Sequence, residues 1–283
     1  MLLQRLGIPG IVDLHVHFMP QRVQEKVWAF FDQVEAAGAP AWPITYRLPE
    51  QQRVEVLRGL GVKAFSTLNY AHRPGMAAWL NDYSTQMAAE YPEVIHSGTF
   101  YPEPEAEEIA IGALEAGARI FKIHIQVGGF SPIDPQLTGA WQAVAQAGTP
   151  VIIHCGHGPH PGEHTGIEPI YELLEKFPDL ILIIAHAGLP DYYAFAQLAA
   201  EHRGVYLDTT MVGTDYMEQI APVPQDYPEL IAGLPGKIVL GSDFPSIPYR
   251  YEHQLEVLED WRLGDAWLAD VLWHTPRSLV GLD

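Results

Sequence analysis

Short apolar runs rich in β-branched residues recur along the chain, and each is followed by a turn and a stretch with helical periodicity. In the helix-like stretches at residues 106–117 and 137–148, apolar residues return every three or four positions. Gly117 and Gly148 end these stretches, as Gly61 ends a similar one, where a helix C-terminus favours a left-handed residue. The predicted strands are residues 10–17, 62–69, 94–100, 119–125, 150–155, 180–186, 204–210 and 237–243.

The number and order of these elements predict the architecture. Strands that alternate with helices indicate parallel βαβ units, and eight such units in 283 residues predict an α/β fold, a distorted (β/α)₈ TIM barrel. We expect one domain over residues 1–283. An open doubly wound sheet is the alternative, but no nucleotide-binding fingerprint supports it. Residues 156–162, GHGPHPG, share only glycines with a phosphate-binding loop, because their prolines and histidines cannot open a helix in that way.

Two connections are longer than a plain βα repeat requires. Residues 20–60 follow the first predicted strand, and the proline-rich residues 211–235 follow the seventh. We expect the first connection to form an ordered excursion over the barrel mouth, and a contact between the subunits of a homodimer is the alternative. Both loops are expected to shape substrate specificity, because the loops that follow barrel strands line the mouth.

Charge and cysteine content narrow the class of partner. The chain has 35 acidic and 16 basic residues, which disfavours a nucleic-acid partner and a nuclease, since phosphates need a basic surface. Cys155 is the sole cysteine, so no disulfide can form within the chain, and a reducing compartment fits. The strongly apolar run at residues 180–185 is too short to span a bilayer. We expect a cytoplasmic protein that acts on a small molecule, without a membrane partner.

Polar residues gather at the carboxyl ends of the predicted strands, which is where a barrel carries its chemistry. In the first strand Asp13, His15 and His17 alternate, and alternate residues of a strand point to the same face. Neutral imidazole and carboxylate are the usual ligands of Zn²⁺ and similar ions. The sequence therefore predicts a divalent metal site at the barrel mouth. The other strand-end residues are Lys122, His124, His154, His186, Asp208 and Asp243.

Four motifs in this order resemble the amidohydrolase superfamily. They are DLHVH at 13–17, PVIIHCG at 150–156, LIIAHAG at 182–188 and VLGSDFP at 239–245. More closely, they resemble the amidohydrolase-related branch that includes the aminocarboxymuconate-semialdehyde decarboxylase-like enzymes. The resemblance covers all eight predicted strands.

This resemblance implies a set of ligands and a proton carrier. It implies that His15, His17, His154 and Asp243 bind one metal ion, Zn²⁺ foremost, with Mn²⁺ as the alternative. It also implies that His186 is the general base or acid beside the metal-bound water, and that Asp243 takes part in moving protons. In binuclear relatives a lysine of the fourth strand is carbamylated and bridges two metals. Lys122 lies on that strand, but the single-metal branch needs no such bridge.

The remaining candidates either support the site or bind substrate. Asp13 lies deeper than His15, so support of a ligand or a structural hydrogen bond is expected rather than metal ligation. Asp208 is expected to orient a ligand or the substrate. Each substrate-binding candidate also has a structural interpretation, an internal ion pair for Lys122 and a plain surface position for the loop residues. These candidates are His72, Arg73, Lys122, His124 and His157.

The predicted activity is that of a metal-dependent hydrolase. Metal-activated water would attack a small amide, lactone or ester, which could also carry a carboxylate. The first alternative is a metal-dependent nonoxidative decarboxylase of a small unsaturated or aromatic carboxylic acid, because the same metal shell serves both reactions. The second alternative, from another class, is a noncatalytic metal-binding scaffold.

Overall fold

The predicted strands form a parallel barrel in the computed structural model, which describes residues 2–36, 38 and 40–282. Each predicted strand is present but shorter than expected, and the third is divided in two at His96. The bounds are β1 Ile11–Asp13, β2 Val62–Ser66, β3 Val94–Ile95, β4 Ser97–Gly98, β5 Ile120–His124, β6 Val151–His154, β7 Leu182–Ile184, β8 Val205–Asp208 and β9 Ile238–Val239.

Hydrogen bonds join these strands into a ring. Parallel pairing between neighbours joins β1, β2 and β3 in that order and, separately, joins β4 through β9 in chain order. Next to the β3–β4 interruption, Arg119 N–H donates to the carbonyl of His96 over 2.9 Å. Where the segment of β1 meets that of β9, the Leu14 N–H donates to the carbonyl of Leu240 over 3.1 Å, and Val16 forms a parallel bridge with Phe244. Because the first strand lies beside the last, the TIM barrel is confirmed and the doubly wound alternative is wrong.

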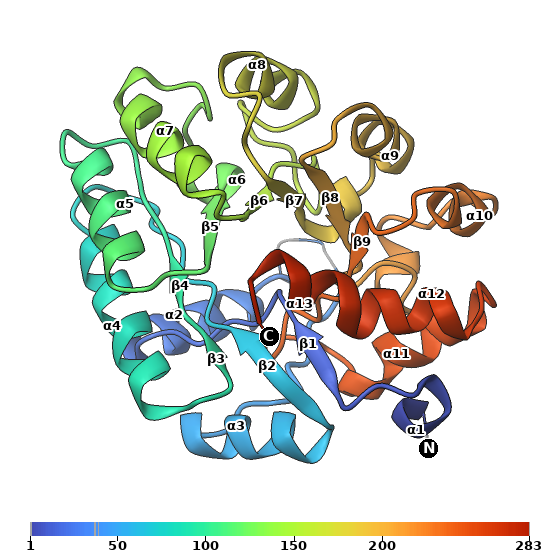
Figure 1. Cartoon of the computed structure of the whole chain (residues 1–283). Coiled ribbons are helices and arrows are strands. Elements are labelled where there is room, and N and C mark those ends of the chain that lie inside the picture. The colour runs from blue at the N-terminus through green and yellow to red at the C-terminus, as the bar shows by residue number, and fades with distance from the viewer. Residues whose placement is uncertain (1, 37, 39, 283) are drawn as a thin grey trace.

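Helices surround the strands on the outside (Figure 1). The two periodic stretches form α5 and α7, and Gly117 and Gly148 follow them with φ of 99° and 62°, as expected of left-handed C-terminal residues. The bounds are α1 Leu2–Leu6, α2 Gln21–Phe31, α3 Glu50–Gly59, α4 Ala77–Glu90, α5 Ala106–Glu115, α6 Ile125–Gly128, η1 Pro135–Leu137, α7 Thr138–Ala147, α8 Glu168–Lys176, η2 Ala185–Gly188, α9 Tyr192–Glu201, η3 Met217–Gln219, α10 Tyr227–Ala232, α11 Tyr251–Asp260, α12 Asp265–Ala269, η4 Asp270–His274 and α13 Thr275–Leu279.

The strands separate two apolar clusters. Phe121 and Ile123 of β5 belong to the large cluster shared with the helices, whereas Ile120 belongs to a smaller cluster formed by residues of several strands. This division follows the two-residue period of a strand. Val280, just after α13, packs into the smaller cluster, and Figure 1 shows α13 and the C-terminus in front of the strands. The smaller cluster fills the barrel interior at the end opposite the strand-end polar residues.

The long connection after β1 contacts the loops that follow the last two strands of the barrel. It contains α2 and α3, and its segment from residue 40 to 47 lies against the loops after β8 and β9. Trp42 Nε1 donates to the carbonyl of Ser246 over 2.6 Å, and the Tyr216 hydroxyl donates to the carbonyl of Pro40 over 2.8 Å. Residues 37 and 39 of this connection lie outside the described residues.

No helix in the described part of the chain has both the length and the apolar character needed to cross a membrane.

Candidate metal centre

Polar side chains from six different strands meet at the carboxyl end of the barrel. The imidazole centroids of His15 and His17 lie 5.1 Å apart, and those of His15 and His186 lie 5.2 Å apart. His154 lies 4.8 Å from His186 and stacks on His124 at 4.0 Å. The structure therefore brings together strand-end residues that are far apart in sequence. The group consists of His15, His17, Lys122, His124, His154, His186, Asp208 and Asp243.

The first strand ends at Asp13, so His15 and His17 lie beyond it and the predicted strand alternation of Asp13, His15 and His17 is wrong. Regular β structure stops there, and both Val12 and Leu14 pack into the cluster inside the barrel. The Asp13 carboxylate accepts hydrogen bonds from the Tyr251 hydroxyl of α11 (2.9 Å) and from the backbone N–H of His15 (3.1 Å). Asp13 is fully buried, and burial raises its pKa to about 7. Asp13 thus anchors the backbone beneath His15.

Left-handed backbone at two strand ends directs functional side chains. His186 and Asp243 have φ of 54° and 66°, a conformation that costs a non-glycine residue on the order of 1–3 kcal/mol. The His186 N–H donates to Asp208 Oδ1 over 2.7 Å, and the Asp243 N–H donates to the carbonyl of His15 over 2.8 Å. A Cβ at Gly241 would lie 2.6 Å from the Cβ of His15, so this close approach requires glycine.

Each of four imidazoles has one ring nitrogen facing a fixed acceptor. The partners are Asp208 Oδ2 for Nδ1 of His15 (2.7 Å) and the Leu68 carbonyl for Nδ1 of His17 (2.6 Å). Nδ1 of His186 lies 3.1 Å from the Thr210 carbonyl, and Nε2 of His154 lies 3.0 Å from the Gly158 carbonyl. Carbonyl and carboxylate oxygens can only accept, so these nitrogens carry the proton.

In the neutral rings of His154 and His186 the other nitrogen then carries a lone pair, and in His15 the lone pair of Nε2 faces Lys122 Nζ over 3.0 Å. Burial lowers the pKa of His15, His154 and His186, which favours their neutral form. Lone-pair nitrogens whose opposite N–H is anchored to a carbonyl or carboxylate are the usual arrangement around a bound metal. The chemistry of these donors therefore fits a divalent cation.

His17 faces an oxygen on each side of its ring. Its Nε2 lies 2.9 Å from Asp243 Oδ1, and its Nδ1 lies 2.6 Å from the Leu68 carbonyl. A proton on Nε2 or a divalent cation held between Nε2 and Asp243 satisfies the first contact. Ligand atoms of His15, His186 and Asp243 all lie within 4.8 Å of one another and could hold such an ion. This compact group includes two of the four predicted ligands and also His186, the predicted proton carrier.

Lys122 is the cation built into the cluster. Its side chain is buried, and its Nζ lies 3.0 Å from Nε2 of His15. Burial lowers its pKa to about 8, while the carboxylates of Asp208 and Asp243 act in the opposite direction. Lys122 therefore contacts a predicted metal ligand.

Three predicted substrate-binding residues lie outside the cluster. His72 and Arg73 are exposed on the loop after β2, and neither shares a hydrogen bond with the cluster within the described ranges. His157 is partly exposed and lies 2.5 Å from the Asp191 carboxylate, through Nδ1. Among these candidates only Lys122 and His124 join the central group.

Several residues that contact the site are missing from the sequence prediction. Tyr70 contacts the rings of His17 and His124, and the carbonyls of Leu68, Gly158 and Thr210 hold three histidines. Tyr70 directly follows the strand predicted at residues 62–69, on the loop after β2, so attention to the residues after each strand could have identified it. The carbonyls could not be found in this way, because every residue has one.

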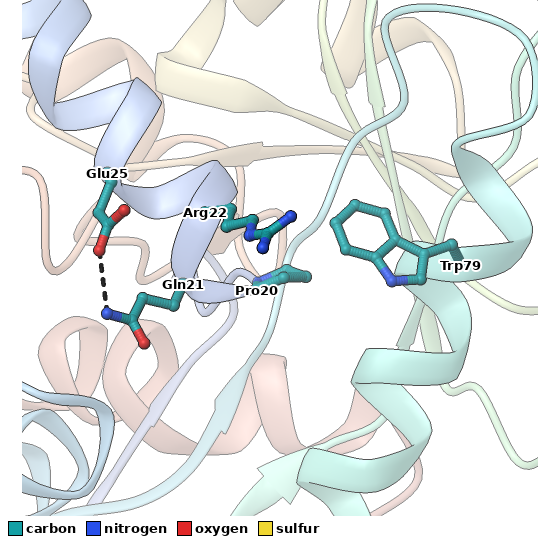
Figure 2. A pocket seen from close by; sticks show the side chains of 5 residues that line it. All are labelled: Pro20, Gln21, Arg22, Glu25 and Trp79. Carbon is teal, nitrogen blue, oxygen red and sulfur yellow. Dashed lines mark hydrogen bonds between the residues drawn. The ribbon is translucent and has the colours of Figure 1, made fainter.

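A surface pocket of about 440 Å³ lies where the connections after β1 and β2 meet (Figure 2). It is lined by Pro20, Gln21, Arg22, Glu25 and Trp79, and Figure 2 shows Arg22 and Trp79 on opposite sides of it. Pro20 is three residues from His17, so their Cα atoms are within about 11 Å. The pocket thus lies near the barrel mouth.

Comparisons with known proteins place the chain in a family. A family model described as amidohydrolase matches residues 12–282, while no curated protein matches the chain. An uncharacterised TIM-barrel protein from Bordetella bronchiseptica superposes with a TM-score of 0.74 at 18% identity, covering 96% of this chain and 98% of that chain. The 5-carboxyvanillate decarboxylase from Sphingomonas paucimobilis superposes with a TM-score of 0.63 at 14% identity, covering 97% and 100% of the two chains.

A third similar structure is described as a hydrolase rather than a decarboxylase. The probable 2-pyrone-4,6-dicarboxylic acid hydrolase from Acinetobacter baumannii, with citric acid bound, has a TM-score of 0.64 at 14% identity and covers 96% and 100% of the two chains. At these identities the superpositions establish the fold alone. The family match extends from β1 to beyond α13 and confirms the resemblance of the four motifs. The chain belongs to the amidohydrolase family.

Proposed function

We propose that the protein is a metal-dependent hydrolase that cleaves a small amide, lactone or ester. The observation that carries this proposal is the set of four imidazoles, each with one ring nitrogen anchored to an oxygen, of which His15, His17 and His186 face the Asp243 carboxylate. In the amidohydrolase family a divalent metal is usual, and this donor set suits one.

We assign the metal to His15, His17, His154 and Asp243, with Zn²⁺ as the expected ion because imidazole and carboxylate are its common ligands. The chemistry that such a cation supplies when bound is Lewis acidity and a lowered pKa of water. Asp208 accepts the Nδ1–H of His15 and keeps that ring in the tautomer whose Nε2 carries the lone pair. Asp13 holds the His15 backbone from the opposite side.

His186 is assigned as the proton carrier. Its Nδ1 is held by the Thr210 carbonyl, so Nε2 can accept a proton from the attacking water. The water oxygen bonds to the substrate carbonyl carbon, the bond to the leaving nitrogen or oxygen breaks, and His186 returns the proton to the leaving group. Asp243 lies within the same group and assists this transfer.

The surroundings of the site favour a small substrate that also carries a carboxylate. The histidines of the centre are at most 9% exposed, which leaves little room for a large substrate. Arg22 and Arg73 lie exposed on the connections after β1 and β2, and neither forms an ion pair in the described ranges. Two structural neighbours are described as acting on ring carboxylic acids, one by decarboxylation and one by hydrolysis.

Hydrolysis is preferred to decarboxylation because the buried centre contains no guanidinium to hold a reacting carboxylate. The buried arginine of the described chain is Arg53, which contacts Gln24 and the Phe18 ring instead. A neutral carbonyl needs no such anchor. A panel of lactones, amides, esters and unsaturated carboxylic acids separates the two reactions. We expect acid release from a member of the first three classes, and CO₂ release without hydrolysis would replace this proposal with the decarboxylase.

Metal content tests the ligands directly. Protein purified without chelator should contain about one divalent metal per chain by elemental analysis, and His15→Ala and His154→Ala should each lose it. His160→Ala, on the exposed loop after β6, is the control and should retain the metal. Retention of the metal by both ligand variants would contradict the assignment. A cytoplasmic location, the absence of nucleic-acid and membrane partners, and a homodimer remain expectations.

A further inference from the structure

The centre contains many hydrogen-bond acceptors and few donors. The lone-pair nitrogens of His154 and His186 and the Asp243 carboxylate accept hydrogen bonds, and the Lys122 side chain, which faces Nε2 of His15, is the cationic donor. Hydrolysis of a carbonyl compound places negative charge on the carbonyl oxygen, and that oxygen needs donors. Further hydrogen-bond donors must therefore come from side chains around the histidines.

Tyr70 is one such side chain. Its ring lies 5.9 Å from that of His17 and 4.9 Å from that of His124, and the residue is partly exposed. Its hydroxyl forms no hydrogen bond to any described residue, in contrast to Tyr101, whose hydroxyl donates to the Gly128 carbonyl over 3.2 Å. Two other hydroxyl oxygens, Thr210 Oγ1 and that of Tyr249, also have no hydrogen-bond partner among the described residues, but both oxygen atoms are shielded from solvent.

The backbone before Tyr70 is held from several sides. Leu68 N–H donates to the Val16 carbonyl over 2.8 Å, and the Leu68 carbonyl accepts from Nδ1 of His17. Asn69 Nδ2 donates to the carbonyls of Phe18 (2.9 Å) and Thr67 (2.8 Å). These contacts tie Tyr70 to the segment that carries His15 and His17. A donor fixed before the reaction stabilises developing charge without reorganisation.

His124 supplies a second donor beside the first. Its Nδ1 accepts the backbone N–H of Val127 over 3.3 Å, so its proton lies on Nε2. Burial lowers the pKa of His124 and keeps the ring neutral, with one N–H. Burial and the nearby Asp243 carboxylate raise the pKa of Tyr70, so the phenol keeps its proton at neutral pH.

We propose that Tyr70 is a catalytic residue whose hydroxyl, together with Nε2–H of His124, donates a hydrogen bond to the substrate oxygen that becomes negatively charged. This proposal rests on the proposed hydrolase function and assigns the oxyanion-stabilising group of that reaction. The proton of Tyr70 stays on its oxygen, so the residue adds no proton transfer to the cycle.

Binding of an oxyanion tests this role without turnover. Methylphosphonate is titrated calorimetrically into zinc-loaded wild type, Tyr70→Phe and the control Tyr101→Phe, which loses one hydroxyl from the same end of the barrel. A lost hydrogen bond to a charged group should weaken binding by Tyr70→Phe on the order of tenfold to a hundredfold. Tyr101→Phe should bind like the wild type. Equal affinities of wild type and Tyr70→Phe, or no binding to the wild type, would overturn the proposal.

Turnover of 4-nitrophenyl acetate provides the second readout. Tyr70→Phe should lower kcat on the order of a hundredfold with KM and melting temperature nearly unchanged, because the ring remains. A rise in KM at unchanged kcat would assign Tyr70 to ground-state binding and contradict the catalytic role. If the wild type binds methylphosphonate through Tyr70 but hydrolyses no ester, lactone or amide, the hydrolase function fails while the donor assignment stands.

Discussion

The two ends of the barrel interior differ in chemistry although the same strands supply both. On β5 the inward position Ile120 is apolar, and the next inward positions are Lys122 and His124. On β6 Ile152 is followed two residues later by His154. The apolar end is closed by Val280 after α13, whereas the polar end opens toward the long loops. One pleat along a strand therefore separates residues that stabilise the fold from residues that can carry out chemistry.

The largest expected effect is at the polar end. His186→Asn should lower turnover by about 10²–10⁴-fold, the usual contribution of a general acid or base. It should leave the metal content unchanged, because His186 is assigned to proton transfer. Kinetics and elemental analysis of the same preparation check both parts, with His160→Asn as the control. Wild-type turnover would remove His186 from the mechanism, and loss of the metal would make it a ligand.

A change at the apolar end should instead affect stability. Ile152→Ala should lower the free energy of unfolding by about 2–5 kcal/mol, because it leaves a cavity among fully buried side chains. Denaturant titration measures this loss, and Ile152→Val should lose only about 0.5–1.5 kcal/mol. Turnover per folded molecule should remain close to wild type. Loss of activity without loss of stability would mean that the two ends are not separate in function.

The smallest expected effect is at the boundary between the two ends, where Asp208 is fully buried and orients His15. Asp208→Asn should weaken metal binding by about 10–100-fold, since the amide cannot accept from every group that the carboxylate does. Competition with a chelator measures this affinity. The control is Asp191→Asn, whose carboxylate faces Nδ1 of His157 away from the cluster. Equal affinities for the two variants would show that the Asp208 contact does not support the metal.

The elements and most of the site were predictable because their signals are local. Strand and helix periods, glycines at helix ends and polar residues at strand ends all occur within short windows. These short patterns predict β1 to β9 and the helices α5 and α7. Because residues at the carboxyl ends of barrel strands converge, they also predict that His15, His154, His186 and Asp243 lie together. His72, Arg73 and His157 are chosen by proximity in sequence and lie outside the central group, because proximity does not determine on which side of a loop a side chain lies; their part in substrate binding stays a prediction.

The sequence by itself determined the type and order of the elements and which residues stand at the strand ends, because periodicity and turn chemistry act between near neighbours. The tertiary structure decided which hydrogen-bond partner each side chain of the site has. His15 meets Asp208, 193 residues away, and His17 meets Asp243, 226 residues away. The Asp208 contact selects which nitrogen of His15 carries the proton. The hydrogen bond from Tyr251 places Asp13 behind His15, and the contacts of Leu68 and Asn69 bring Tyr70 to the site. Such contacts form only when the barrel closes, so no local pattern of residues contains them.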